Sequence, residues 1–292
     1  MQLSANGVLI EVDDQGPPDA PPVLLIMGLG MQLVAWPQGF VNALLRAGFR
    51  VIRFDNRDVG LSQSFDHAGV PNIAVELAKY SLGMKVNSAY TLSDLADDAA
   101  GVLDALGIAG AHVCGASMGG MVAQRLALRR PERVKSLTLM MTSSGARHLP
   151  GPTLKVRAAM LSRPRKAGGM AAILAYYVRL YRLISSPGFP TDDGEIKARV
   201  EAWVRRAYRP QANLRQVVAI AADGDRSSAL AGLRVPTQII HGRADTLVPV
   251  AAAHDLVAKI AGAGLDIVDG MGHDLPEPLW PRFVSVIQAA AR

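Results

Sequence analysis

The sequence predicts an α/β fold with a mostly parallel central sheet that is flanked by helices and carries a helical insertion. The strand-like runs of the first half lie at residues 23–28, 50–55, 111–115 and 134–140. They are continuously apolar rather than alternating, which is typical of parallel strands buried on both faces. Strand-like runs stop near residue 146 and return only at residues 237–242 and 265–270.

The individual elements follow from local patterns in order along the chain. Residues 7–12, GVLIEV, predict an antiparallel edge strand ahead of the parallel ones. Helical spacing of apolar residues fills the gaps between strands, at residues 41–48, 92–107 and 121–134. Each of the two returning strands is followed by a loop and a further helix. Alternation of this kind favours one sheet with helices on both faces.

Residues 146–231 predict a helical cap. Three segments carry helical spacing and are separated by prolines, at residues 170–184, 195–208 and 213–223. We therefore expect residues 1–145 and 232–292 to form one core domain, with the cap inserted between its two parts.

Composition excludes several classes of protein. Half of the 292 residues are hydrophobic and 19% are charged, but no apolar run approaches the roughly 18 to 20 residues of a membrane span. The start lacks the pattern of a secretory signal, and Cys114 is the one cysteine, so we expect a cytoplasmic protein. The net charge of +6 is concentrated in the insertion, yet no motif indicates binding of nucleic acid.

The segment HVCGASMGGMVA, residues 112–123, carries the chemistry. It contains G-x-S-x-G at residues 115–119, between a predicted strand and a predicted helix. This is the pattern of a nucleophile elbow, in which the residues two positions from the serine must lack bulk. Neither a P-loop nor a dinucleotide-binding motif fits these glycines. The sequence therefore predicts Ser117 as a nucleophile.

A serine hydroxyl needs a base, and the base needs an acid to orient it. Of the six histidines, His273 lies in a glycine-rich loop directly after a predicted strand, in GMGHDLPEP. Asp245 follows the strand at residues 237–242, whereas the stretch after the strand next to the nucleophile offers no carboxylate. The order Ser117, Asp245, His273 is the one expected for a triad on this architecture.

The other acids near these motifs have structural or solvated roles in this interpretation. Asp55 and Asp58 flank Arg57 and predict a charge-paired loop beside the site. Asp269 and Asp274 are expected to be solvated.

Two backbone N–H groups are expected to bind the oxyanion. One is the amide of Met118 at the start of a helix, where the helix dipole also favours negative charge. The second is the amide of Leu29, because Gly28 and Gly30 on either side allow a close backbone approach.

The substrate pocket is expected to be apolar. Besides Gly28 and the two oxyanion residues, its candidate lining residues are Trp36, Tyr176, Tyr177, Tyr181 and Trp203. The alternative is structural: the cap aromatics would pack the cap onto the sheet, and Trp36 would staple the start of a helix.

Three segments resemble the α/β-hydrolase superfamily: LLIMGLGMQLVAWP, VIRFDNRDVGLS and HVCGASMGGMVAQRLALRRPERVKSLTLM. They are similar to the serine esterase branch that includes aclacinomycin methylesterase, over roughly residues 7–145 and 233–290. The resemblance implies an esterase that needs no cofactor, with a helical cap over the catalytic edge, and no metal site is predicted. Met27 stands where His-Gly is common, but the oxyanion donor is a backbone amide.

The function expected is hydrolysis of a small, apolar carboxylic ester through an acyl-enzyme. The same triad would also serve a lactonase, a C–C bond hydrolase or a cofactor-free perhydrolase. A small-molecule receptor that retains the triad is the alternative outside enzymes. No nucleic-acid partner is expected, and the sequence leaves a homodimer open.

Overall fold

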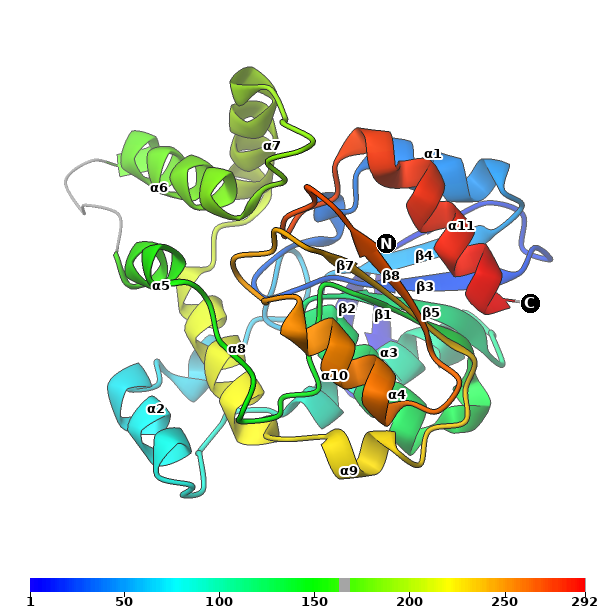
Figure 1. Ribbon diagram of the computed structural model, residues 1–292, viewed down its shortest axis with the longest axis horizontal. Helices are drawn as coiled ribbons and strands as arrows, with labels where there is room; N and C mark the ends of the chain where they lie inside the picture. The colour runs from blue at the N-terminus through cyan, green and yellow to red at the C-terminus, as the bar shows by residue number, and fades with distance from the viewer. Residues whose placement is uncertain (163–168, 292) are drawn as a thin grey trace.

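The computed structural model describes residues 1–162 and 169–291, and at its centre lies a sheet of eight strands (Figure 1). The strands are β1 (Gln2–Ala5), β2 (Val8–Gln15), β3 (Pro22–Ile26), β4 (Arg50–Phe54), β5 (Ala111–Ala116), β6 (Val134–Met140), β7 (Thr237–Gly242) and β8 (Gly264–Val268). Their order across the sheet is β1-β2-β4-β3-β5-β6-β7-β8. The pairs β1·β2 and β2·β4 are antiparallel and the others are parallel, which confirms the predicted sheet. The predicted antiparallel strand is β2, but β1 lies outside it and forms the edge.

Helices cover both faces of the sheet. The helices α1 (Gln38–Arg46) and α11 (Trp280–Ala291) pack on one face, and α3 (Leu92–Ala105), α4 (Met118–Arg129) and α10 (Ala251–Lys259) pack on the other (Figure 1). Buried apolar side chains form one large cluster on each face. The short 3₁₀ helices are η1 (Leu33–Ala35), η2 (Asp66–Ala68), η3 (Pro131–Arg133) and η5 (Glu277–Leu279). Because the strands from β3 to β8 are parallel, their carboxyl ends all lie at one edge of the sheet.

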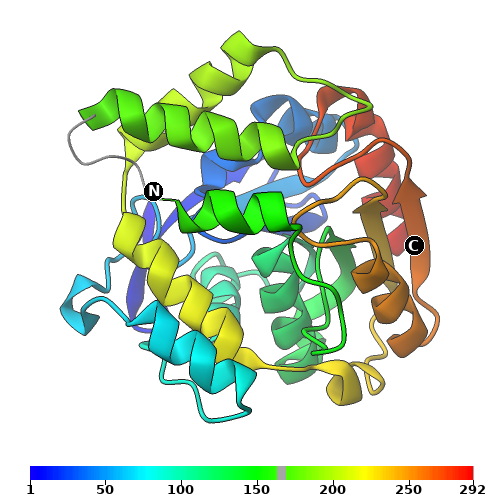
Figure 2. The same ribbon diagram turned by 60° about the vertical axis from the view of Figure 1, so that its left-hand side comes forward.

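Between β6 and β7 the described residues form helices and no strand. These helices are α5 (Leu154–Leu161), α6 (Gly169–Ile184), α7 (Asp193–Arg206), α8 (Pro210–Asp223) and α9 (Ser227–Leu230). Figure 2 shows α5 to α8 on one side of the sheet, with α8 beside α2 (Ile73–Ser81). The helices α6 and α7 share a small apolar cluster of their own, which includes Val200 and Trp203. Among the described helices, none has both the length and the apolar composition that a membrane crossing requires.

Two buried ion pairs attach this helical insertion to the loop after β4. Arg215 of α8 binds Asp58 through two hydrogen bonds of 2.5 and 2.8 Å, and the two side chains are 1% and 0% exposed. Arg206, the last residue of α7, donates to Asp55 at 2.7 Å, and that carboxylate is also fully buried. The insertion is therefore held to the core by charges that are shielded from solvent.

The expectation that Asp55 and Asp58 pair with Arg57 is wrong. Arg57 binds Asp98 of α3 through two hydrogen bonds of 2.6 Å. The loop turns sharply here, with Asp58 at a φ of 71°, and its charged side chains contact different elements. The loop is charge-paired as predicted, but its partners come from distant parts of the chain.

Replacing Arg215 by Met should lower the free energy of unfolding by about 3 to 5 kcal/mol, because the Asp58 carboxylate would stay buried without its cation. The double variant Arg215→Met, Asp58→Asn should recover much of this loss, since no uncompensated buried charge remains. Urea denaturation measures both. As a control, Arg205→Met breaks an exposed pair with Glu201 and should change stability little. Equal losses in the single and double variants would contradict the explanation by charge.

Candidate active site

Ser117 lies at a sharp turn between β5, which ends at Ala116, and α4, which begins at Met118. Its φ of 55° and ψ of −123° are rarely adopted by a residue with a side chain. Hydrogen bonds from the neighbouring β6 region hold this conformation. The Ser117 N–H donates to the Met140 carbonyl at 2.9 Å, and the Thr142 hydroxyl donates to the Ser117 carbonyl at 2.7 Å. The strand, the sharp turn and the helix have the geometry that the sequence predicts for this segment, and the role of Ser117 as a nucleophile stays a prediction.

The two glycines of the elbow are required by close backbone packing. A Cβ at residue 119 would lie 2.0 Å from the Ile26 carbonyl oxygen at the end of β3. A Cβ at residue 115 would lie 2.3 Å from the Gly119 carbonyl oxygen. Because both obstacles are backbone atoms, only glycine allows α4 to begin this close to β3 and β5.

Asp245 and His273 form a hydrogen-bonded pair. Asp245 follows β7 and His273 follows β8, and 2.6 Å separates Asp245 Oδ2 from His273 Nδ1. The other carboxylate oxygen accepts the N–H groups of Leu247 and Val248 at 2.9 and 2.8 Å. Burial disfavours the charged carboxylate, but His273 and His241 hold the pKa of Asp245 well below its usual range. The pair therefore has a fixed anion behind the imidazole.

His241 is a third member of this cluster, at a position inside the strand that residues 237–242 predict. Its side chain is fully buried in β7, and its Nε2 lies 2.7 Å from the Val248 carbonyl oxygen and 3.4 Å from Asp245 Oδ2. A nitrogen this close to a carbonyl oxygen is the donor, so Nε2 carries the proton. The apolar run that predicts this strand gave no signal of the contact between His241 and the acid.

Asp274 is buried, which overturns the expectation that it is solvated. Its side chain accepts a short hydrogen bond from the Ser186 hydroxyl, and Ser186 Oγ in turn accepts the Gly272 N–H at 2.9 Å. Burial raises the pKa of Asp274, against the hydrogen bonds from Ser186. The His273 N–H also donates to the Ile184 carbonyl at 2.6 Å. The end of α6 and the residues directly after it therefore hold the loop that carries the His273 imidazole.

Ser117 and His273 are not hydrogen-bonded to each other in this structure. Both follow parallel strands, so both lie at the carboxyl edge of the sheet, together with Asp245. Within residues 1–162 and 169–291, the Ser117 hydroxyl has no hydrogen-bond partner. Catalytic hydrogen bonds often form only when substrate is bound.

The loop after β3 lies against the elbow. A Cβ at residue 28 would approach Ser117 Cβ to 3.0 Å, so Gly28 allows the close contact that the sequence predicts. Among the hydrogen bonds of the described residues, none uses the N–H of Leu29 or of Met118 as donor. Both amides thus remain available, as an oxyanion site requires.

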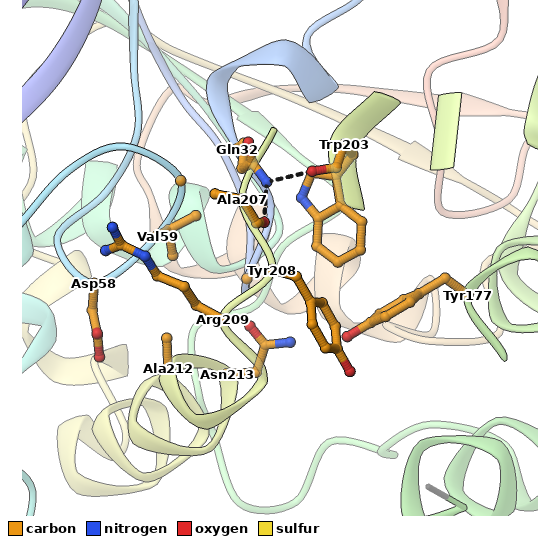
Figure 3. A pocket seen from close by; sticks show the side chains of 12 residues that line it. Gln32, Asp58, Val59, Tyr177, Trp203, Ala207, Tyr208, Arg209, Ala212 and Asn213 are labelled. Atoms are coloured by element: carbon orange, nitrogen blue, oxygen red, sulfur yellow. Dashed lines mark hydrogen bonds between the residues drawn. The ribbon is translucent and has the colours of Figure 1, made fainter. Parts of the chain in front are cut away.

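A small pocket lies where this loop meets the insertion. Figure 3 shows the rings of Tyr177, Tyr208 and Trp203 together on one side of it. The ring centroids of Tyr177 and Trp203 are 4.6 Å apart in an edge-to-face arrangement. Gly30 and Asn213 also line the pocket, whereas Ser117 is not among its described lining residues. Tyr177 and Trp203 therefore lie beside the loop after β3, in a pocket whose described lining does not include Ser117.

The remaining pocket candidates lie elsewhere. Trp36 is fully buried in the core beneath α1, with its ring stacked on Phe40 at 5.8 Å, so the prediction that it binds substrate is wrong. Its apolar ring follows η1 and packs where α1 begins, which is the structural alternative. Tyr176 contacts the Tyr177 ring edge to face, and Tyr181 packs in the α6 and α7 cluster. Their contact with substrate stays a prediction.

Comparison with known proteins identifies the family. The model of the family described as the alpha/beta hydrolase fold matches residues 21–277. The chain belongs to the α/β-hydrolase family. This α/β-hydrolase is 30% identical to rhodomycin D methylesterase DauP of Streptomyces sp. (strain C5), over 99% of this chain and 97% of that protein.

Solved structures show the same fold. The meta-cleavage product hydrolase CumD of Pseudomonas fluorescens IP01 superposes with a TM-score of 0.75 at 24% identity, over 99% of this chain and 96% of that one. The enol-lactonase of Burkholderia xenovorans LB400 superposes with a TM-score of 0.72 at 23% identity, over 99% of both chains. These matches confirm the resemblance and the fold predicted from the sequence. Together with the methylesterase, family membership supports a carboxylic ester hydrolase.

Gly119→Ala should lower the free energy of unfolding of this α/β-hydrolase by about 2 kcal/mol or more, because the methyl group would overlap the Ile26 carbonyl. Thermal and urea denaturation measure the loss. Gly232→Ala is the matched control, since a Cβ at residue 232 would lie 3.3 Å from its nearest neighbour, the Ala229 carbonyl oxygen. Equal stability of the two variants would contradict the packing argument.

Asp274→Asn should change how stability depends on pH. Because the pKa of Asp274 is raised in the folded protein, the folded state binds more protons here than the unfolded state above about pH 4. Wild type should therefore lose stability relative to Asp274→Asn as the pH rises from about 4, in urea denaturation. Asp269→Asn is the control, because that side chain is 81% exposed. The explanation would be contradicted if the difference in unfolding free energy between wild type and Asp274→Asn stayed constant with rising pH, or changed in favour of wild type.

Proposed function

We propose that the chain is a serine esterase that hydrolyses carboxylic esters through an acyl-enzyme. The observation that carries the proposal is the pair of Asp245 and His273, joined at 2.6 Å on the sheet edge where Ser117 occupies a strained elbow. The 30% identity with a methylesterase over the full chain supports the same reaction class.

In the proposed reaction, His273 Nδ1 keeps its proton and donates a hydrogen bond to the Asp245 carboxylate, so Nε2 carries the lone pair. Substrate binding brings Nε2 within reach of the Ser117 hydroxyl and His273 removes its proton, while Ser117 Oγ forms a bond to the ester carbonyl carbon. The imidazolium then protonates the leaving alcohol as the C–O ester bond breaks. Water, deprotonated by the same histidine, cleaves the acyl-enzyme and restores Ser117.

The negative charge that develops on the carbonyl oxygen is stabilised by the amides of Leu29 and Met118. Both amides lack hydrogen-bond partners among the described residues, so neither has to break a bond to accept the oxyanion. The Met118 amide also lies at the N-terminus of α4, where the helix dipole favours an anion.

The substrate in this proposal is a small-molecule ester with an apolar body. Residues 146–231 act as the cap, and the rings of Tyr177, Trp203 and Tyr208 form an aromatic surface beside the loop that carries the Leu29 amide, where the apolar body of the substrate binds. The rings offer broad apolar faces, which suit a flat or bulky ester. Tyr176 and Tyr181 extend this surface along α6.

Ser117→Ala should reduce kcat/KM for ester hydrolysis by a factor of at least about 10³, because the nucleophile is lost while the oxyanion amides remain. The measurement is a comparison of wild type and variant on p-nitrophenyl esters of increasing chain length, on lactones and on methyl esters of bulky acids. Asp245→Asn should reduce kcat by about 10⁴-fold, since the wrong tautomer of His273 is then favoured.

Two results would contradict this proposal. Full ester hydrolysis by the folded Ser117→Ala variant would exclude Ser117 as the nucleophile. Binding of esters by wild type with negligible repeated turnover would indicate a receptor. Preferential turnover of lactones in the same screen would keep the triad but change the substrate class.

A further inference from the structure

One face of α8 contacts the loop that carries the proposed oxyanion donor. Gln216 is fully buried, and its Oε1 accepts the N–H of Gly30 at 2.7 Å. Its Nε2 lies 3.4 Å from the Arg57 carbonyl oxygen. Asn213 lies one turn earlier on the same helix face and borders the pocket beside Tyr208 (Figure 3). Gln216 therefore bridges two loops of the core, the one after β3 and the one after β4.

The loop itself is a tight turn. The Met31 N–H donates to the Gly28 carbonyl at 3.2 Å, so Leu29 and Gly30 are the two central residues. Gly30 has a φ of 66°, the value that a type II turn requires at its second central position. The peptide between Leu29 and Gly30 would reverse its N–H and carbonyl directions in a type I turn. Gln216 accepts the N–H of that peptide.

The contact with α8 leaves no space at residue 30. A Cβ there would lie 2.2 Å from Asn213 Oδ1, so the turn is pressed against the helix. The helix is held in turn by the buried pair of Arg215 and Asp58. Gln216 therefore lies on a helix of fixed position, in direct contact with the loop after β3.

We propose that Gln216 is a positioning residue for the oxyanion site. By accepting the Gly30 N–H, it holds the turn in place, and with it the neighbouring Leu29 amide, at the point where residue 28 approaches Ser117. The inference rests on the proposed function, because it assigns a catalytic use to the Leu29 amide. In this proposal the helical insertion helps to position a catalytic group in addition to acting as the cap.

Gln216→Met tests the proposal, because methionine keeps the length of the side chain and removes the acceptor. We expect kcat for a p-nitrophenyl ester to fall by about 10- to 100-fold, less than for loss of an oxyanion donor, with KM changed by less than about threefold. Gln216→Glu should restore most of kcat, since either protonation state keeps an acceptor for the Gly30 N–H.

The matched control is Gln124→Met. Gln124 is also fully buried, but its amide contacts Ser143 and Arg226 instead of the oxyanion loop. This variant should lower the melting temperature without a comparable fall in kcat per active site, counted by fluorophosphonate labelling of Ser117. Loss of kcat in proportion to stability across all three variants would overturn the proposal, as would unchanged kcat in folded Gln216→Met.

A second measurement does not depend on turnover. Hydrogen exchange of residues 28–31 should be about fivefold faster or more in Gln216→Met than in wild type, and near wild type in Gln216→Glu, because one hydrogen bond is lost or kept. Faster exchange together with no effect of Ser117→Ala on hydrolysis would mean that the proposed function fails while the loop contact holds. Unchanged exchange in Gln216→Met would overturn the positioning role itself.

Discussion

Where α4 begins, its backbone lies so close to the Ile26 carbonyl that a methyl group at residue 119 has no room. This contact brings the first turn of the helix against the ends of β3 and β5 at once. The chain can enter α4 from β5 only through a sharp reversal, and Ser117 adopts the positive φ that the reversal demands. The loop after β3 is brought beside the serine by the same packing. The positions of Ser117 and of the loop beside it follow from that approach.

The insertion packs on the core through apolar side chains such as Ala219 and Leu230, and polar contacts join it to the site. Asp55 is a central point of these contacts, because its carboxylate accepts the N–H groups of Leu33 and Leu61 as well as the guanidinium of Arg206. On the other side of the site, Ile184 and the residues after it bind the loop of His273. Buried charges and hydrogen bonds are directional, so they set the relative position of two elements more narrowly than apolar packing does.

The sequence predicted the fold, and the strand ends at which Ser117, Asp245 and His273 lie, because these signals are local. The strands after which Ser117, Asp245 and His273 stand are continuous apolar runs, and glycines mark the elbow. The partners of the charged loop could not be predicted, since Arg215 lies in a helix far along the chain and spacing says nothing about which face it presents. The role of Trp36 could not be decided for a similar reason: an aromatic ring near a site motif has the same local pattern whether it lines a pocket or fills the core.

The ion pairs that hold α7 and α8 limit which helical insertions can be exchanged between members of the family. An insertion grafted from a relative would have to bring cations that meet Asp55 and Asp58, or leave two carboxylates buried without partners. A graft that folded well on its own could still leave the turn at residues 28–31 without its acceptor. Chimeras of this chain would therefore inherit specificity from the grafted helices only if residue 206 of α7 and residues 213, 215 and 216 of α8 were kept from this chain.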